Sequence, residues 1–173
     1  MGNYGGTFHI FTFRLPQKRV MPQYIGEYSC KLDDKGRVII PAALKKQLPK
    51  DQVKALVVNR GFDKCLTLFT KKEWLVETKK LDNLNEFNRK DRRFKRLFNS
   101  GATEIGMDNA SRILIPKKLI EYAEFEAELI FYAYGNKIEI WSKKNYEDQM
   151  EIDPDEFSDL AEEVMSPQPD DDD

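Results

Sequence analysis

Short segments with alternating or contiguous apolar residues recur along the chain, and turn residues separate them, which is typical of β-strands. Tyr28, Cys30 and Leu32 alternate with polar residues, which predicts a strand with one buried face. Further strands are predicted at residues 38–40, 55–58, 65–69, 102–107, 112–115, 129–132 and 137–141. Val38, Ile39 and Ile40 are read as a short buried strand. The sequence therefore predicts a mainly β protein with short helices, an α+β fold.

Helix signals follow several of these strands. Pro41 is expected at the first position of a helix that ends before Pro49, since proline has no N–H to leave unsatisfied there. Thr70 and Glu73 match a capping box and predict the start of a second helix. Shorter helices are expected at residues 116–125 and from residue 143 onward. We therefore expect each group of strands to be followed by a helix.

The chain contains an internal repeat. Residues 29–44 match residues 107–119 about 75 positions later, with four corresponding pairs: Asp33 and Asp108, Arg37 and Arg112, Pro41 and Pro116, Leu44 and Leu119. Downstream, residues 66–74 match residues 138–146. Each copy is about 45 residues long, at 27–74 and 103–146. A unit of that size cannot bury an adequate core alone, so we expect the two copies to pack together.

Between the copies, residues 75–102 are predicted to be helical, with a second helix ending near Asn99 and Gly101 just beyond it. One face of this helix is apolar and holds Phe87, Phe94, Leu97 and Phe98. Its arginines recur at helical spacing on another face: Arg89, Arg92, Arg93 and Arg96. This stripe is interpreted either as a solvated or inter-subunit salt-bridged surface, or as a set of contacts to phosphate.

Both repeats place an Asp-x-x-x-Arg element in a tight turn. The carboxylate can accept backbone N–H bonds and hold the arginine, so Asp33, Asp108 and Arg112 are expected to be structural, together with Pro41 and Pro116. The first turn also brings cations together and has a glycine that allows close backbone approach. We therefore expect DNA contacts from Lys31, Lys35, Gly36 and Arg37. The second turn has Ala110 and Ser111 instead, and Asn109 is expected to supply any left-handed position.

The net charge of −2 hides a strong asymmetry. Residues 151–173 hold eleven acidic residues and no Lys or Arg, which leaves 28 basic and 19 acidic residues in 1–150, a net charge of +9. A basic body with an acidic tail is common among nucleic-acid binders, although a solvated surface looks similar. We expect residues 1–23 to be a disordered extension, with Met21 as an alternative start, and residues 151–173 to be a disordered tail.

Other functional classes have little support in the sequence. Cys30 and Cys65 lie in apolar strand patterns and are read as small core residues. His9 is the only histidine, so no metal site and no cofactor are expected. No apolar segment is long enough to cross a membrane. The sequence shows no nucleophile–base pair and no phosphate loop, so we expect neither an enzyme nor a small-molecule substrate.

The two Asp-x-x-x-Arg elements, each followed by a hydrophobic residue and proline, resemble the MraZ family, as does the Arg-Arg-Phe-Lys-Arg-Leu-Phe segment at 92–98. Members of that family are bacterial transcriptional regulators of the division and cell-wall gene cluster, built from two SpoVT/AbrB-like domains. The resemblance covers about residues 24–150 and leaves out the first residues and the acidic tail.

This resemblance implies two such domains, at 27–74 and 103–146, that form one pseudo-two-fold β-barrel, double-ψ or of the swapped-hairpin type. It also implies a cytoplasmic, nucleoid-associated repressor that forms a ring and binds direct repeats in double-stranded DNA upstream of its own operon. By matching positions, the turn with Arg37 would read DNA, and the second copy would mainly complete the barrel.

Two other binding functions stay open at this stage. An antitoxin-like interaction module could wrap a basic partner with its acidic tail, although one copy plus a tail would suffice for that. RNA binding is disfavoured because the aromatic residues lie in core patterns and not on a stacking platform.

Overall fold

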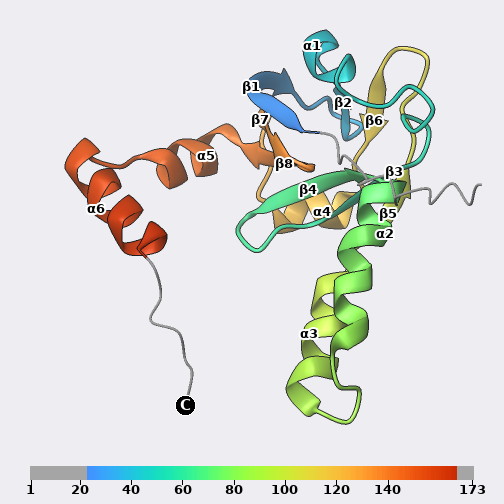
Figure 1. The fold of residues 1–173 in the computed structure, drawn as a ribbon. Helices are drawn as coiled ribbons and strands as arrows, with labels where there is room; N and C mark the ends of the chain where they lie inside the picture. The colour runs from blue at the N-terminus through green and yellow to red at the C-terminus, as the bar shows by residue number, and fades with distance from the viewer. Residues whose placement is uncertain (1–22, 167–173) are drawn as a thin grey trace, which may run out of the picture.

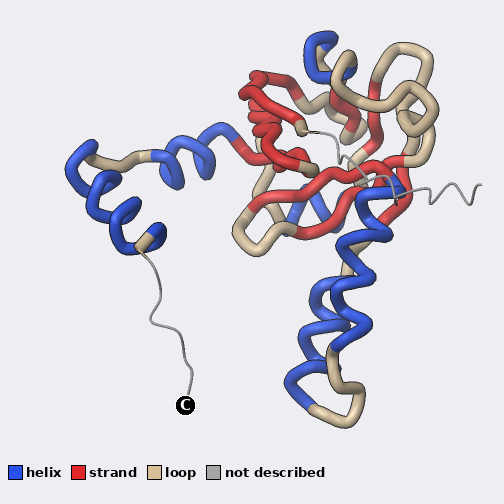
Figure 2. Tube along the Cα trace, viewed as in Figure 1, coloured by secondary structure: helices blue, strands red, loops and turns tan. Residues whose placement is uncertain are grey.

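The computed structural model describes residues 23–166. Its largest element is a six-stranded antiparallel sheet (Figures 1 and 2). In spatial order the strands are β1 (Tyr24–Lys31), β7 (Glu128–Gly135), β8 (Lys137–Ser142), β4 (Cys65–Thr70), β3 (Leu56–Arg60) and β5 (Thr103–Ile105). A separate two-stranded ribbon joins β2 (Arg37–Ile39) to β6 (Arg112–Leu114). The predicted α+β class with a dominant β content is confirmed.

The two sequence repeats interlock within this architecture. Strands β1, β2, β3 and β4 of the first copy correspond to β5, β6, β7 and β8 of the second, and exchanging the copies leaves the sheet order unchanged. Four pairings cross between the copies: β1 with β7, β3 with β5, β4 with β8, and β2 with β6. The arrangement therefore has a pseudo-two-fold axis that passes between β4 and β8.

The larger of two hydrophobic clusters is shared by both copies. Ile40 and Leu44 of the first copy belong to the same buried cluster as Ile115 and Leu119 of the second, and each is at most 2% exposed. Most buried side chains of the sheet join this cluster, which lies between the sheet and the ribbon. Burial of both sets removes apolar surface that neither copy could cover alone. The expectation that each copy serves as the partner of the other is confirmed.

In chain order the helices are α1 (Ala42–Lys45), α2 (Lys71–Lys79), η1 (Lys80–Asn83), α3 (Arg89–Asn99), α4 (Lys117–Tyr122), α5 (Lys143–Met150) and α6 (Pro154–Met165). All of them except α6 lie in segments that the sequence predicted to be helical. The helices α2 and α3 form a hairpin that projects from the sheet (Figure 1). The predicted capping box is present: Thr70 Oγ1 accepts from the Glu73 N–H at 3.3 Å, and Glu73 Oε2 accepts from the Thr70 N–H at 2.8 Å. Glu73 is 2% exposed, and its Oε1 accepts from the Tyr24 hydroxyl at 2.7 Å.

The structure differs from the sequence prediction in the acidic tail. Residues 154–165 form the helix α6, where disorder was expected. Asp153 caps this helix by accepting from the Asp155 N–H at 2.9 Å, Pro154 lies in its first turn, and acidic residues there interact favourably with the helix dipole. The prediction of disorder rested on the high negative charge of residues 151–173 and did not include these helix-start signals. Residues 1–22 of the predicted extension and 167–173 of the tail lie outside the described residues.

Two smaller predictions also need correction. The left-handed residue of the second turn is Ser111, with φ of 60°, and not Asn109. Ser111 corresponds to Gly36 of the first turn, where φ is 78°, so both turns have a left-handed residue at this position, glycine in one and serine in the other. Pro41 precedes the first residue of α1 instead of occupying it.

Candidate nucleic-acid interface

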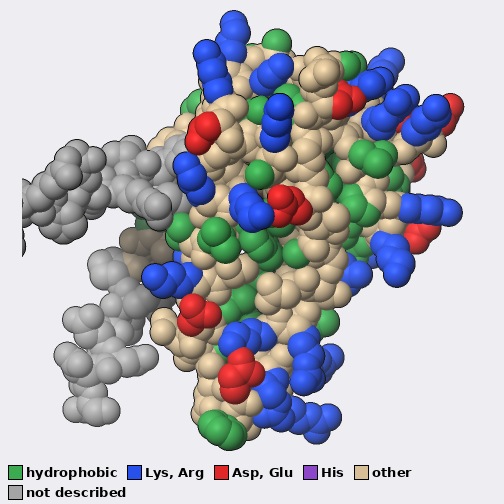
Figure 3. All heavy atoms as spheres, turned by 90° about the vertical axis from the view of Figure 1, so that its right-hand side faces the viewer, with side chains coloured by type: hydrophobic (Ala, Val, Ile, Leu, Met, Phe, Trp, Pro, Cys, Tyr) green, Lys and Arg blue, Asp and Glu red, His purple; other side chains and the backbone are tan. Residues whose placement is uncertain are grey.

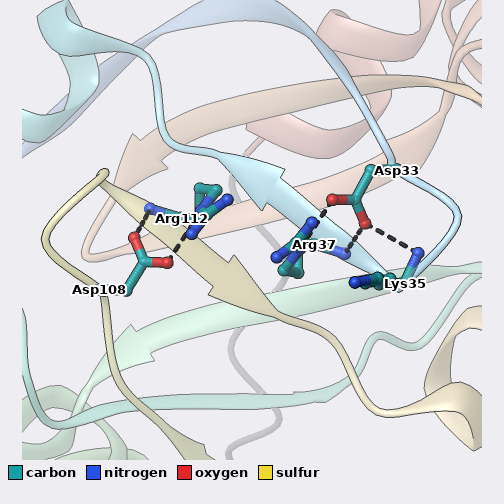
Figure 4. Close-up of polar contacts among 5 residues, drawn as sticks. All are labelled: Asp33, Lys35, Arg37, Asp108 and Arg112. Carbon is teal, nitrogen blue, oxygen red and sulfur yellow. Dashed lines mark hydrogen bonds and ion pairs between the residues drawn. The ribbon is translucent and has the colours of Figure 1, made fainter.

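The two Asp-x-x-x-Arg turns have the same hydrogen-bond geometry (Figure 4). Asp33 Oδ1 accepts from the N–H groups of Lys35 and Arg37 at 2.9 and 2.8 Å, and its Oδ2 accepts from Arg37 Nε at 2.7 Å. Asp108 receives the equivalent bonds from Ala110 and Arg112, at 2.9, 2.9 and 2.8 Å. Each carboxylate therefore fixes its turn and holds one guanidinium group in place.

The electrostatics of the turns follow from these bonds. The backbone N–H of Arg37 holds the pKa of Asp33 below its ordinary value, and its side chain adds to the effect. The backbone N–H and side chain of Arg112 lower the pKa of Asp108 in the same way. Both carboxylates are therefore ionised at neutral pH, and each arginine is oriented by a charge-assisted bond.

Both arginines keep part of the guanidinium available at the surface. The side chains of Arg37 and Arg112 are 33% and 36% exposed. Within the described part of the chain, only the Nε atom of each makes a hydrogen bond or ion pair. The sequence predicted different roles for the two residues, but their contacts are the same. Any functional difference between them must come from their neighbours.

The ribbon β2–β6 presents both arginines on one face. Arg37 lies opposite Leu114, and Ile39 lies opposite Arg112. Directly opposite residues of an antiparallel pair share a face, and alternate residues of a strand do as well. The other face carries Val38 and Ile113, which are at most 1% exposed. The outer face therefore consists of two arginines and two aliphatic side chains.

The aliphatic members of this face were missed by sequence reasoning. Ile39 was read as part of a buried strand, but it is 59% exposed, and Leu114 is 56% exposed. Period-two alternation is the signal that could have found them, since Arg37 and Ile39 flank the buried Val38. We call this surface, made by Arg37, Ile39, Arg112 and Leu114, the ribbon face.

Lys31 and Lys35 are exposed at the first turn, but Gly36 is buried. A Cβ atom at Gly36 would lie 3.0 Å from Ile120 Cδ1 and 3.2 Å from the Ile115 carbonyl oxygen. The Gly36 carbonyl accepts from the Ile115 N–H at 2.9 Å, as the Ser111 carbonyl does from Ile40. Close packing within the protein and the left-handed backbone therefore explain the glycine, while its contact with DNA stays a prediction.

The second turn binds a lysine side chain of the first copy. Lys45 Nζ donates to Ser111 Oγ at 2.6 Å, so this lysine of the first copy is bound to the turn of the second. Several Lys and Arg side chains project from the upper part of the molecule in Figure 3, at the height where α1 and the ribbon lie in Figure 1, and others lie along its right edge and at the bottom.

The arginine stripe of α3 is not brought close to the ribbon face. Figure 1 places α3 at the far end of the α2–α3 hairpin and the ribbon at the opposite end of the molecule. Arg89, Arg93 and Arg96 are exposed, whereas Arg92 Nη1 donates to the Glu86 carbonyl at 2.6 Å. The two groups of predicted DNA-binding residues therefore form two separate basic surfaces.

The remaining candidate residues have structural settings. Pro41 and Pro116 precede α1 and α4 with nearly equal φ values of −55° and −58°. Cys30 and Cys65 are free thiols in apolar surroundings, and burial raises the pKa of each to about 12.

The described residues contain no group of three His, Cys, Asp or Glu side chains placed to hold a metal ion. Between residues 23 and 166, no helix has both the length and the apolar character that a bilayer crossing requires.

Comparison with known proteins identifies the family. The family model described as "MraZ protein" matches the chain twice, at residues 24–97 and 98–166, and its description adds the suggestion "antitoxin-like". The chain belongs to the MraZ family. The second match runs through α6, so the MraZ pattern includes the part of the tail that the sequence-based resemblance left out.

Curated relatives agree with this assignment. The chain is 42% identical over 146 residues to a protein named transcriptional regulator MraZ from Christiangramia forsetii, with 84% of this chain and 94% of the relative covered. Proteins of the same name from Flavobacterium psychrophilum and Cytophaga hutchinsonii are 40% and 38% identical. Those alignments cover 84% and 83% of this chain, and 93% and 95% of the relatives.

Proposed function

We propose that this chain is a DNA-binding transcriptional regulator that contacts double-stranded DNA through the ribbon face. The observation that carries this proposal is the pair of guanidinium groups that Asp33 and Asp108 hold on one exposed two-stranded ribbon. A two-stranded ribbon fits the major groove, where arginine recognises guanine and aliphatic groups contact the thymine methyl. The names of the curated relatives support regulation of transcription.

Within this proposal, Arg37 and Arg112 contact base edges, and Ile39 and Leu114 provide the apolar contacts. The exposed Lys31 and Lys35 bind phosphate beside the first turn. Since the second turn has Ala110 in the position of Lys35, phosphate binding is stronger on the side of the first copy. Such contacts position the protein on DNA, whereas base contacts give sequence preference.

We further propose that the chain represses the division and cell-wall gene cluster in the cytoplasm, at the nucleoid. It would bind direct repeats upstream of its own operon as a ring. One ribbon face offers few phosphate contacts, so a single copy would bind weakly and with strong salt dependence. Linked copies convert later contacts into intramolecular ones and can raise avidity by roughly 10²–10⁴. Direct repeats suit similarly oriented copies better than a two-fold dimer, which would require a palindrome.

Binding to DNA upstream of the gene tests the proposal directly. Fluorescence anisotropy should show tighter binding to that DNA than to a scrambled duplex of equal length, and Arg37→Ala should remove most of the difference. Equal affinity for both duplexes would overturn sequence-specific recognition.

An antitoxin-like module is the second candidate, because α6 carries five acidic residues and no basic ones. Co-purification of a basic protein with the full chain, together with no DNA preference, would favour it.

A further inference from the structure

The helix α6 has an apolar stripe that its own chain leaves uncovered. Phe157, Leu160 and Val164 follow helical spacing and share one side of the helix. They are 61%, 46% and 69% exposed, and every residue of α6 is exposed. Isolated helices of this length are only marginally stable in water, and most helices gain their stability from packing of an apolar face. A partner surface is therefore expected for α6.

A groove of suitable chemistry lies between the α2–α3 hairpin and the sheet. Its cavity has a volume of about 740 Å³, and its apolar lining includes Phe62, Phe69, Phe94, Leu97 and Phe98. Phe62, Leu97 and Phe94 are 82%, 57% and 40% exposed. Phe98, which lines the groove, stacks on Trp74 of α2 with a ring-centroid distance of 5.7 Å, so this part of the groove wall is held in place by α2. Aromatic surfaces of this kind are typical of protein contacts.

The charges of the helices α3 and α6 are opposite. The helix α3 carries six basic residues and one acidic one, whereas α6 carries five acidic residues and no basic ones. Helical spacing places Lys90 and Arg93 next to Phe94 and Leu97, which line the groove. It also places Glu156 and Glu163 at the border of the apolar stripe of α6. Contact between the two apolar surfaces would therefore bring carboxylates next to ammonium and guanidinium groups.

In this structure α6 does not occupy the groove of its own chain, since every residue of the helix is exposed. Figure 1 shows α6 at the left of the molecule and the α2–α3 hairpin projecting below the sheet, as two separate projections. Only residues 151–153 join α6 to α5, a segment that spans about 10 Å at most when extended. Because the apolar stripe of α6 and the groove are apart and both exposed in this structure, each is open to a second copy.

We propose that α6 of one copy inserts Phe157, Leu160 and Val164 into the α3 groove of a second copy, with its carboxylates facing the basic residues of α3. This proposal rests on the oligomeric regulator described above and assigns the contact that assembles it. The helix and the groove are different surfaces, so the contact is heterologous and passes from copy to copy in one direction. Such contacts form a ring when the rotation closes. The arginines of α3 then bind carboxylates in the assembly, and DNA binding is left to the ribbon face.

Sedimentation velocity of the full chain without DNA tests this contact. Leu160→Glu on α6 and Leu97→Glu in the groove should each convert the assembly to monomer, whereas Lys118→Glu on α4 should leave it intact. Far-ultraviolet circular dichroism and melting temperature would establish that the monomers are folded. Assembly that persists in both folded variants would overturn the proposal.

A charge exchange provides a second test that does not depend on truncating the apolar contact. The pair Lys90→Glu and Arg93→Glu, and the pair Glu156→Arg and Glu163→Arg, should each weaken assembly. An equimolar mixture of the two proteins should restore it, because every groove then meets a helix of opposite charge. No recovery on mixing would contradict the arrangement.

Anisotropy on the same samples separates this inference from the proposed function. Loss of assembly with weak residual operator preference in the monomers supports both. Normal assembly of every α6 variant, with operator preference that depends on Arg37, would overturn only the contact. A wild-type assembly that α6 controls but that has no operator preference would overturn only the DNA-binding function.

Discussion

Ile39 of the first repeat lies directly opposite Arg112 of the second across the β2–β6 ribbon. The same register places Arg37 opposite Leu114, so the two arginines occupy diagonal positions on one exposed surface. Each repeat therefore contributes one guanidinium group and one aliphatic side chain to the ribbon face.

Arg37→Ala and Arg112→Ala should both weaken operator binding, by roughly 1–3 kcal/mol each if each arginine contacts a base edge. The reason is that the two side chains have the same anchoring and similar exposure. Arg37→Lys is the matched control: it keeps the charge but loses the planar fork, so it should retain binding to random DNA better than binding to the operator. A loss confined to Arg37→Ala would show that only the first copy reads DNA.

Gly36→Ala should destabilise the fold by about 1–3 kcal/mol, since it places a Cβ in a left-handed backbone and against the Ile115 carbonyl. Ser111→Gly is the reciprocal change: it removes the strain of a left-handed non-glycine residue but also the contact of Ser111 Oγ with Lys45. Urea denaturation would measure both. An unchanged midpoint for Gly36→Ala would show that the turn can adopt another conformation.

The contribution of Asp33 and Asp108 to stability should depend on pH. Because their pKa values are lowered in the folded state, their stabilising effect is complete above the unfolded pKa of about 3.9. It is lost as the pH falls through the folded values. Asp33→Asn and Asp108→Asn should therefore be less stable than the wild type at neutral pH, and the difference should shrink in acid. A gap that stays constant from pH 7 to about pH 2 would contradict this linkage.

Removal of Glu73 should be more harmful than removal of the other half of its capping box. Glu73→Ala leaves the buried Tyr24 hydroxyl and the Thr70 N–H without their acceptor, at about 1–3 kcal/mol for each unsatisfied group. Thr70→Ala loses one N-cap bond, for which about 1 kcal/mol is typical. Thermal melts of the two variants would compare them directly. Equal melting temperatures would show that water replaces the lost carboxylate.

Much of the fold could be predicted from the sequence because the sequence contains an internal repeat. The match of Asp33 with Asp108 and of Leu44 with Leu119 indicated two equivalent units, and the size of each unit required a shared core. The capping box at Thr70 could be read locally, since its two partners lie three residues apart. The cross-copy strand pairing could not be read in this way, because register between distant strands leaves no local signal.

The candidate site was predictable only in part. The Asp–Arg bonds follow from the spacing within each turn, but the exposure of Ile39 depends on which face of the ribbon meets the core. The distance of α3 from the ribbon depends on the direction of the whole α2–α3 hairpin. The helix α6 was not predicted, because the eleven acidic residues of 151–173 indicated disorder. The helical spacing of Phe157, Leu160 and Val164 within that segment is the signal that indicates a helix.

The strand order that stays unchanged when the copies are exchanged has a genetic consequence. In a dimer of identical chains, one codon change alters both halves of a two-fold surface at the same time. Here the halves are encoded separately, so one half can change while the other is preserved. The replacement of Lys35-Gly36 by Ala110-Ser111 in one turn only is a difference of this kind, and it gives each molecule a distinguishable left and right half.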